Sequence, residues 1–363
     1  MLGRCQRRAA FTLPCRRGNR ALGGLLCTAA KGLPSMSGPS TDVIAIGNAI
    51  VDVMAPCSDA LIDQLGMTRG GMTLIDTDGA NRLYDAMGPA REISGGSAAN
   101  TLAGLAALGA KCAFIGQVAD DQLGAVFAHD IRAGGIQFAT PARAGDPPTA
   151  RCLIFVTPDG QRTMNTYLGA SQFMPAAALD EAAIADAAVL YLEGYLWDPE
   201  EPRAAMRRAI AAARGAGRKV AFTLSDAFVI ARHGDDFRAL IAAGQIDILF
   251  ANHVEVAALT GCDLFDDGIA ALKDKVPCLV VTRGEDGAVA VCNGERAQVP
   301  AEPVAKVVDT TGAGDLFAAG FLLGHVRGAR LETCLRYGAI CAAEIISHYG
   351  ARPEADLAAL IAG

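Results

Sequence analysis

Short apolar runs alternate with helix-forming stretches along most of this chain, and this alternation constrains the fold more than any other feature. The pattern is clearest where apolar runs at 189–192, 219–224 and 247–251 are separated by helical stretches at 200–214 and 236–243. Parallel strands need a long crossover between them, usually a helix. We therefore predict an α/β fold with a doubly wound, mostly parallel sheet and helices on both of its faces.

Two pairs of strands interrupt this alternation. Residues 149–156 and 162–167 flank Thr157-Pro158-Asp159-Gly160, which is typical of a hairpin turn. A second hairpin is expected at 287–292 and 296–299. We expect the first hairpin to belong to a small β lid, inserted at about 53–76 and 148–168 into an α/β domain that spans residues 42–363.

The composition excludes several classes of protein. The chain has 363 residues, 52% of them hydrophobic, so it can bury a large core. Its formal charge is −7, and the first 41 residues hold only basic charges, so the remainder is more acidic still; this argues against a nucleic-acid partner. It has no apolar run long enough to span a membrane. Eleven cysteines without a C-x-x-C pair indicate neither a disulfide framework nor a zinc site.

Residues 1–36 form a separate basic extension, which we expect to be disordered. An arginine-rich stretch without acidic residues is typical of a mitochondrial transit peptide. The alternative is upstream sequence before a true start at Met36, which the Ala- and Arg-rich composition favours. We therefore expect a cytoplasmic protein, or a mitochondrial one if the extension is a real transit peptide.

The stretch Asp309-Thr310-Thr311-Gly312-Ala313-Gly314-Asp315 is followed by an apolar run. It is typical of a small-residue turn that leads into the first turn of a buried helix. Amides at a helix start lack intrahelical partners, and glycines let a phosphate approach the backbone closely. The stretch therefore predicts an anion site with Asp315 beside it.

Asp315 has two interpretations. Beside an anion site, its carboxylate can take the proton of an attacking hydroxyl while the amides stabilise charge on a transferred phosphoryl group. Alternatively, it only complements the positive end of the helix dipole, which contributes about 0.3–1 kcal/mol. The loop by itself leaves both interpretations open, because Gly-rich turns before helices are common.

Further candidates lie at strand ends and helix starts. Asn48 and Asp52 follow a predicted strand at 43–47, where the ligand crevice of an open α/β sheet lies. The turn Gly95-Gly96 precedes a helix that carries Asn100. These polar side chains can bind substrate hydroxyls, but a turn role for Asp52 and a structural hydrogen bond for Asn100 fit equally well.

Asn252 and Glu255 lie three residues apart at a predicted helix start. This spacing fits a capping box, worth about 0.5–2 kcal/mol. It also fits a pair that holds the water shell of Mg²⁺ near phosphates, because Mg²⁺ keeps several waters and takes few protein ligands. The local sequence favours the cap.

The order and spacing of these motifs resemble the PfkB family of carbohydrate and nucleoside kinases from Asp42 to Pro353. Both family signatures are present, G-G-S-A-A-N at 95–100 and D-T-T-G-A-G-D-L-F-A-A-G-F-L at 309–322, and the second is highly specific. The opening segment at 46–52 looks more like the adenosine kinase branch than the ribokinase branch. The resemblance implies a ribokinase-like fold.

The resemblance also implies a role for each candidate residue. Asp315 matches the catalytic base. The anion hole for the transferred phosphate falls on Gly312, Ala313 and Gly314. The contacts to acceptor hydroxyls fall on Asn48, Asp52, Gly95, Gly96 and Asn100. The remaining nucleotide phosphate contacts fall on Asn252, Thr282, Gly284 and, on the lid, Arg162.

Cofactors follow from the same resemblance. It implies ATP with Mg²⁺, which Glu255 would hold through water as part of the family's N-x-x-E element, and this shifts the preference at that position from cap to function. Asp309, together with Thr311, matches the loop that binds a monovalent cation such as K⁺ in ribokinase-like members. Phe173 is a candidate for stacking on a purine.

We therefore predict an ATP-dependent kinase that phosphorylates a primary hydroxyl, with the 5′-OH of adenosine as the expected acceptor. A PfkB sugar kinase acting on ribose, fructose or a related sugar is the nearest alternative. A non-catalytic nucleotide-binding regulator is a third. The implied partners are a nucleoside or sugar, without nucleic acid or membrane, in a monomer or homodimer.

Overall fold

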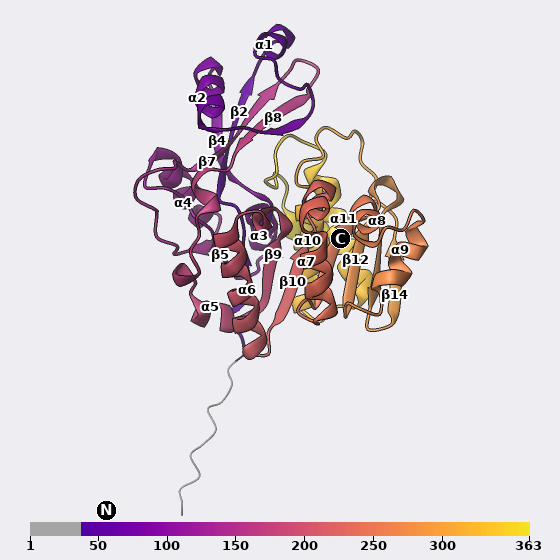
Figure 1. Cartoon of the computed structure of the whole chain (residues 1–363). Coiled ribbons are helices and arrows are strands. Elements are labelled where there is room, and N and C mark those ends of the chain that lie inside the picture. Colours follow the sequence, from indigo (N-terminus) through magenta and orange to yellow (C-terminus); the bar gives the residue numbers. More distant parts are fainter. Residues whose placement is uncertain (1–37) are drawn as a thin grey trace, which may run out of the picture. The chain divides into compact units, whose positions relative to one another are not determined.

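The computed structural model describes residues 38–363, and the chain divides into the units Met1–Gly38 and Pro39–Gly363. The predicted basic extension at 1–36 lies outside the described residues. The second unit contains a large sheet and a small sheet (Figure 1). None of the helices in residues 38–363 has the length and apolar character that a membrane crossing requires.

The large sheet has nine strands, and all its pairings are parallel except those of β13 with its two neighbours. Its spatial order is β14 (Glu295–Val299), β13 (Ala288–Cys292), β12 (Cys278–Thr282), β11 (Ile248–Asn252), β10 (Lys219–Thr223), β9 (Ala187–Glu193), β1 (Thr41–Ile46), β5 (Cys112–Ile115) and β6 (Ile136–Phe138). The predicted mostly parallel sheet is confirmed.

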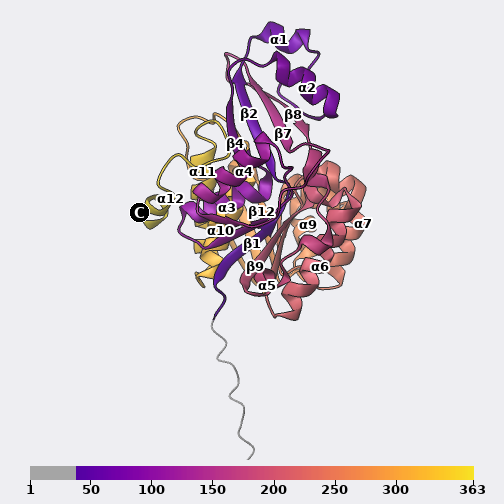
Figure 2. The ribbon, with the colours of Figure 1, turned by 90° about the vertical axis from the view of Figure 1, so that its left-hand side faces the viewer.

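Helices cover both faces of the large sheet because its strands are apolar on both sides. Successive side chains of a strand point to opposite faces, and alternate residues of β1 accordingly enter two separate cores. One core contains helices α3 (Ser97–Ala107), α4 (Gln122–Ala133), α10 (Ala313–Val326), α11 (Leu331–Ile345) and α12 (Leu357–Ala362). The other contains α5 (Glu181–Ala185), α6 (Glu200–Gly215), α7 (Ala227–Ala242), α8 (His253–Thr260) and α9 (Phe265–Leu272). Figure 2 shows α3, α10 and α11 on one side of the sheet and α6, α7 and α9 on the other.

Helix α10 packs closely against α3. A methyl group at Gly104 of α3 would lie 2.5 Å from Leu316 Cδ1 and 2.8 Å from Ala319 Cβ. Only a residue without a side chain allows this approach. The contact places the first two turns of α10 against the C-terminal half of α3.

The small sheet has five strands in the order β3 (Met72–Leu74), β8 (Arg162–Tyr167), β7 (Ala150–Val156), β2 (Ile50–Pro56) and β4 (Arg91–Gly95). Helices α1 (Asp59–Gln64) and α2 (Thr77–Ala86) accompany it (Figure 1). The expected lid segments, 53–76 and 148–168, omit β4 and the start of β2. The chain passes from β1 into β2 within three residues, so Asp52 lies inside a strand of the small sheet rather than after the first strand.

Some elements agree with the sequence prediction, and others begin at a different residue for a local reason. Both predicted hairpins are present, as β7–β8 and β13–β14. The helix expected at 236–243 begins earlier, at Ala227, because Asp226 caps it through a bond from the Phe228 amide. A disulfide that the composition did not indicate joins Cys278 and Cys292, which lie directly opposite each other on β12 and β13.

Candidate active site

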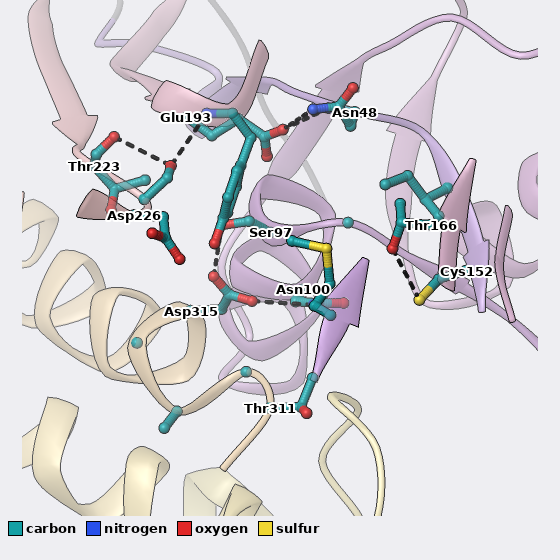
Figure 3. Close-up of a pocket in the computed structure, with 18 of the residues that line it drawn as sticks. Asn48, Ser97, Asn100, Cys152, Thr166, Glu193, Thr223, Asp226, Thr311 and Asp315 are labelled. Atoms are coloured by element: carbon teal, nitrogen blue, oxygen red, sulfur yellow. Dashed lines mark hydrogen bonds between the residues drawn. The ribbon is translucent and has the colours of Figure 1, made fainter. Parts of the chain in front are cut away.

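A cavity of about 660 Å³ is lined by residues of both sheets and by the starts of α3, α8 and α10 (Figure 3). It receives the carboxyl ends of parallel strands, where open α/β sheets bind their ligands. The predicted site residues that line it are Asn48, Asp52, Gly96, Asn100, Asn252, Glu255, Thr282, Gly312, Ala313, Gly314 and Asp315. Those that do not line it are Gly95, Arg162, Gly284 and Asp309.

Asp315 lies in the first turn of α10, and its carboxylate is held by two side chains of α3. Ser97 Oγ donates to Oδ1 at 2.6 Å and Asn100 Nδ2 donates to Oδ2 at 3.0 Å. Burial raises the pKa of Asp315, while these two hydrogen bonds oppose the increase. The result is a carboxylate of fixed orientation, with raised basicity, at the wall of the cavity (Figure 3).

The loop before Asp315 presents free amides to the same cavity. The Ala313 amide donates to Thr310 O at 3.2 Å, and Leu316 N is bonded to Gly312 O at 2.8 Å. In the described part of the chain, the amides of Gly312, Gly314 and Asp315 have no backbone acceptor, and α10 has no side-chain cap. These are the donors that an anion at a helix N-terminus uses.

The two glycines of this loop differ in what they permit. Gly312 has φ +80°, and a methyl group there would lie 2.8 Å from Ala351 Cβ. A methyl group at Gly314 would meet nothing within 4 Å. Gly312 therefore sets the backbone turn, whereas Gly314 leaves the approach to the amides open.

This difference predicts distinct effects for two neighbouring substitutions. Gly312→Ala should lower the free energy of unfolding by about 1–2 kcal/mol, because a side chain disfavours the left-handed conformation. Gly314→Ala, the matched control, should keep or slightly raise the stability, because alanine favours the helix, and should still reduce phosphotransfer by obstructing the anion. Urea unfolding and steady-state kinetics on both variants test this, and equal losses of stability would contradict it.

Asp52 lines the same cavity from β2 of the small sheet. A methyl group at Gly95 would lie 2.5 Å from Asp52 Oδ2, so Gly95 makes room for this carboxylate from behind. Burial raises the pKa of Asp52 to about 6, and the positive charge of Arg352 is the main opposing influence. In the described residues, no protein group donates a hydrogen bond to the Asp52 side chain, which leaves its oxygens available to a ligand.

Asn48 and Asn100 also line the cavity, but their amides already have protein partners. Asn48 Nδ2 donates to Glu193 Oε1 at 2.7 Å, and Asn48 Oδ1 accepts from Ser171 at 2.8 Å. Asn100 Oδ1 accepts from Arg352 Nη1 at 2.7 Å. Each amide keeps only part of its hydrogen-bonding capacity for a substrate.

Sequence reasoning missed two residues that organise the site, Glu193 and Arg352. Glu193, fully buried at the end of β9, accepts a bond from the backbone amide of Asn48 at 2.8 Å (Figure 3). It also accepts one from the backbone amide of Ala98 at 2.7 Å. Its position at a strand end before a glycine is the signal that could have revealed it. Arg352 lies in the C-terminal segment, where no local pattern marks it.

The candidate metal and phosphate residues on α8 form a complete capping box. Asn252 Oδ1 accepts from the Glu255 amide at 2.8 Å, and Glu255 Oε2 accepts from the Asn252 amide at 3.0 Å. Burial raises the pKa of Glu255 to about 7. Both residues line the cavity, so the cap and a ligand role remain compatible. Thr282, at the end of β12, lines the cavity too, whereas Gly284 lies beyond it.

Arg162 and Asp309, predicted as separate ligands, contact each other. Arg162 Nη1 forms an ion pair with Asp309 Oδ2, and both side chains are 6% exposed. Arg162 Nη1 also donates to Thr311 Oγ1 at 3.2 Å. This pair joins β8 of the small sheet to the loop that precedes α10.

Comparison with known proteins agrees with this geometry. The sequence model of the pfkB family carbohydrate kinases matches residues 76–357. The chain belongs to the PfkB family. This PfkB kinase is 33% identical over 294 residues to an ATP-dependent ribose-1-phosphate kinase of Halopiger xanaduensis. The matched region covers 77% of this chain and 91% of the relative.

Solved structures similar to this PfkB kinase include nucleoside and sugar enzymes. An adenosine kinase from Sinorhizobium meliloti is 47% identical, with a TM-score of 0.82, over 88% of this chain and 98% of the other. A probable sugar kinase from Rhizobium etli is 44% identical, with a TM-score of 0.83, over 88% and 97%. The ribokinase-like fold is confirmed, and the enzyme is a kinase for sugars or nucleosides.

The charges around the PfkB cavity fit a nucleotide that arrives with a cation. Asp52, Glu193, Asp198, Asp226, Glu255 and Asp315 line it, and no lysine or arginine of residues 38–363 does. A polyphosphate next to these carboxylates needs a counterion. Residues 38–363 contain no cluster of three metal-binding side chains, so a Mg²⁺ ion would depend on phosphates and water for most of its ligands, with Glu255 in reach through water.

One side of the PfkB cavity is apolar and aliphatic. We call this surface the acceptor wall; it consists of Ile50, Met72, Leu74, Ile154, Met164 and Leu168. Within it, the Thr166 hydroxyl donates to Cys152 Sγ at 3.2 Å (Figure 3). Phe173, the predicted purine partner, does not line the cavity; it is 37% exposed and packs under the Arg143 guanidinium, 4.8 Å from the ring centroid.

Proposed function

We propose that this PfkB kinase transfers the γ-phosphoryl group of ATP to the 5′-hydroxyl of adenosine. The acceptor wall is the observation that supports a nucleoside most strongly. A free sugar has hydroxyls on all sides and would lose their hydration against six aliphatic side chains. A nucleoside can place its ribose at Asp52 and its base against the acceptor wall, where apolar burial stabilises it. The similarity to an adenosine kinase points the same way.

In this proposal, the chain's own residues position the reactants and move one proton. Asp52 accepts hydrogen bonds from two ribose hydroxyls, with Asn48, Gly95, Gly96 and Asn100 around it. Asp315, oriented by Ser97 and Asn100, takes the proton of the 5′-hydroxyl as it attacks.

The nucleotide is proposed to lie on the opposite side of Asp315. The amides of the Gly312–Gly314 loop receive the negative charge of the transferred group, and Asn252 and Thr282 lie along the remaining phosphates. Mg²⁺ bound with ATP supplies positive charge that neutralises the phosphates.

A coupled assay of ADP formation tests the acceptor. ATP is offered with adenosine, other nucleosides, ribose, fructose and ribose 1-phosphate, and Asp315→Asn serves as the inactive control. The highest kcat/KM is expected for adenosine. A preference for a free sugar would favour the alternative sugar kinase, and no ADP with any acceptor would favour a nucleotide-binding regulator.

Substitution of Leu74 tests the acceptor wall directly. Leu74 is 49% exposed on the edge strand β3, so Leu74→Ser should leave the fold intact. We expect the KM for adenosine to rise about tenfold, because roughly half of a leucine side chain's burial energy is lost. The KM for any sugar that is turned over should stay the same.

Leu264→Ser is the matched control, since Leu264 is 67% exposed and does not line the cavity. A second explanation for the exposure of Leu74 is that β3 pairs with another subunit, because strand edges invite pairing. Sedimentation of both variants separates these explanations. If Leu74→Ser changes the oligomeric state and leaves the KM unchanged, the acceptor wall does not contact the base.

A further inference from the structure

The ion pair between Arg162 and Asp309 occupies the place where the family resemblance led us to expect a monovalent cation. Asp309 opens the loop that shapes the anion site, and Thr311 was expected to share the cation. The structure instead places one guanidinium nitrogen of Arg162 on both Asp309 and Thr311. Both members of the ion pair are almost completely buried.

The remaining contacts of Asp309 leave no room for a further ligand. Oδ1 accepts from the Thr311 amide at 3.0 Å and from the Thr311 hydroxyl at 2.8 Å. Oδ2 accepts from the Gly350 amide at 3.0 Å and from Arg162. A carboxylate offers about four lone-pair directions, and here all four face donors. The nearby Ile346 carbonyl also accepts, from the Val308 amide at 2.8 Å. These residues do not fit an added K⁺ ion.

We propose that the guanidinium of Arg162 permanently replaces the diffusible monovalent cation, so that this kinase works without K⁺. A guanidinium and a K⁺ ion carry the same single charge, and either one balances Asp309. A buried carboxylate without such a charge would be strongly disfavoured. Arg162 therefore fixes the Asp309–Thr311 segment from which the Gly312 turn and α10 begin.

The replacement ties this segment to the small sheet. Arg162, Met164 and Thr166 occupy alternate positions of β8, so they belong to the same face of the strand. Met164 and Thr166 line the acceptor side of the cavity. A cation from solvent would leave the loop independent of the small sheet, whereas Arg162 makes the shape of the anion site depend on it.

The alternative role of Arg162 is the one that the family resemblance implied, a direct contact to the phosphates of ATP. The two roles differ in one measurable respect. If Arg162 only neutralises Asp309, K⁺ from solvent can supply the positive charge that is missing when Arg162 is removed. A missing hydrogen-bond donor to a phosphate cannot be supplied in this way, and its loss would raise the KM for ATP at every K⁺ concentration.

The first measurement uses the native enzyme. The protein is exchanged into a buffer with tetramethylammonium as the only monovalent cation, and KCl is added at constant ionic strength. We expect the phosphotransfer rate to be unchanged by K⁺. Activation of the native enzyme by K⁺ would overturn the proposal. This arm rests on the phosphotransfer function proposed above.

The second measurement uses Arg162→Ala. Its rate should be low without K⁺ and should rise about fivefold or more when K⁺ is added. The double variant Arg162→Ala with Asp309→Asn should not respond to K⁺. Arg151→Ala removes a guanidinium from the neighbouring strand β7, away from Asp309, and should behave as the native enzyme does.

Thermal unfolding supplies a readout that needs no acceptor and no turnover. K⁺ should raise the unfolding midpoint of Arg162→Ala and leave those of the native enzyme and of Arg151→Ala unchanged, because only a folded state with an empty site gains from binding. If Arg162→Ala does not fold without K⁺, recovery of the folded state when K⁺ is added would support the proposal equally. A variant that K⁺ neither activates nor stabilises would overturn the proposal, even if the kinase function itself proved different.

Discussion

Asparagine at position 315 should reduce kcat by on the order of 10²–10⁴-fold while ATP binding stays nearly intact. Asparagine has the size of aspartate, and the Ser97 hydroxyl can rotate to suit it, so the site should keep its shape. What is lost is the negative charge that accepts the proton. Turnover is measured by ADP release and nucleotide affinity by calorimetry.

Ser97→Ala is the companion variant for this prediction. It keeps the proposed base and removes one of the two hydrogen bonds that orient it. A loss of about ten- to a hundredfold in kcat is expected, because a hydrogen bond to a charged group contributes about 1.5–3 kcal/mol. If Asp315→Asn retains the full rate, Asp315 is not the base, whatever the effect of Ser97→Ala.

Replacement of Asp52 by asparagine should reduce kcat/KM for the acceptor by on the order of 10²-fold, because hydrogen bonds from two hydroxyls to a charged carboxylate are lost. The same substitution should make the folded protein more stable at neutral pH. Burial raises the pKa of Asp52 from 3.8 to about 6, so folding favours its protonated form. The stability that this provides is fully present below pH 3.8 and is lost as the pH rises through about 6.

Kinetics and unfolding at two pH values test this pair of effects. Near pH 8, Asp52→Asn should unfold at higher denaturant than the native enzyme, and the difference should shrink in acid. Asp85→Asn, at an exposed position of α2, is the control and should change neither property. A less stable Asp52→Asn at pH 8 would mean that Asp52 has a structural role.

The dependence of kcat/KM on pH in the native enzyme should reflect the same two carboxylates. In their proposed roles, Asp52 binds hydroxyls and Asp315 accepts a proton in the ionised form, and the pKa of each is raised by burial. We therefore expect kcat/KM for the acceptor to fall as the pH drops below about 6. In Asp52→Asn the part of this decrease that belongs to Asp52 should disappear. A flat profile between pH 5 and 8 would contradict the assignment of either carboxylate.

The large sheet and its helices could be predicted from the sequence because their signals are local. Apolar runs of strand length, helical stretches between them and Gly-rich turns at helix starts each report on their own neighbourhood. The position of Asp315 at the first turn of α10 follows from such a signal. Strands β3 and β6 have only three residues each, and Ile93 is the single apolar residue with a large side chain in β4, so none of the three shows a clear pattern and tertiary packing decides them.

The contacts that complete the site could not be predicted in this way. Arg352 reaches Asn100 from a segment 252 positions away, and no spacing rule connects them. Arg162 and Asp309 were each predicted to bind a ligand. They bind each other instead, although 147 positions of chain separate them. Local patterns identify which residues are polar and near a strand end. Only the folded chain shows which of them are already satisfied by each other.

The division of the cavity between two sheets has a consequence for how such an enzyme can change. The proposed proton acceptor and the proposed phosphate loop lie at the start of α10, which packs on α3 at Gly104, whereas the acceptor wall belongs to strands of the small sheet and to Leu168 beside them. New specificity can therefore arise by exchanging a few aliphatic side chains while the transfer chemistry is inherited unaltered. Redesign toward bulkier or more polar acceptors should begin on β3, whose free edge tolerates substitution best.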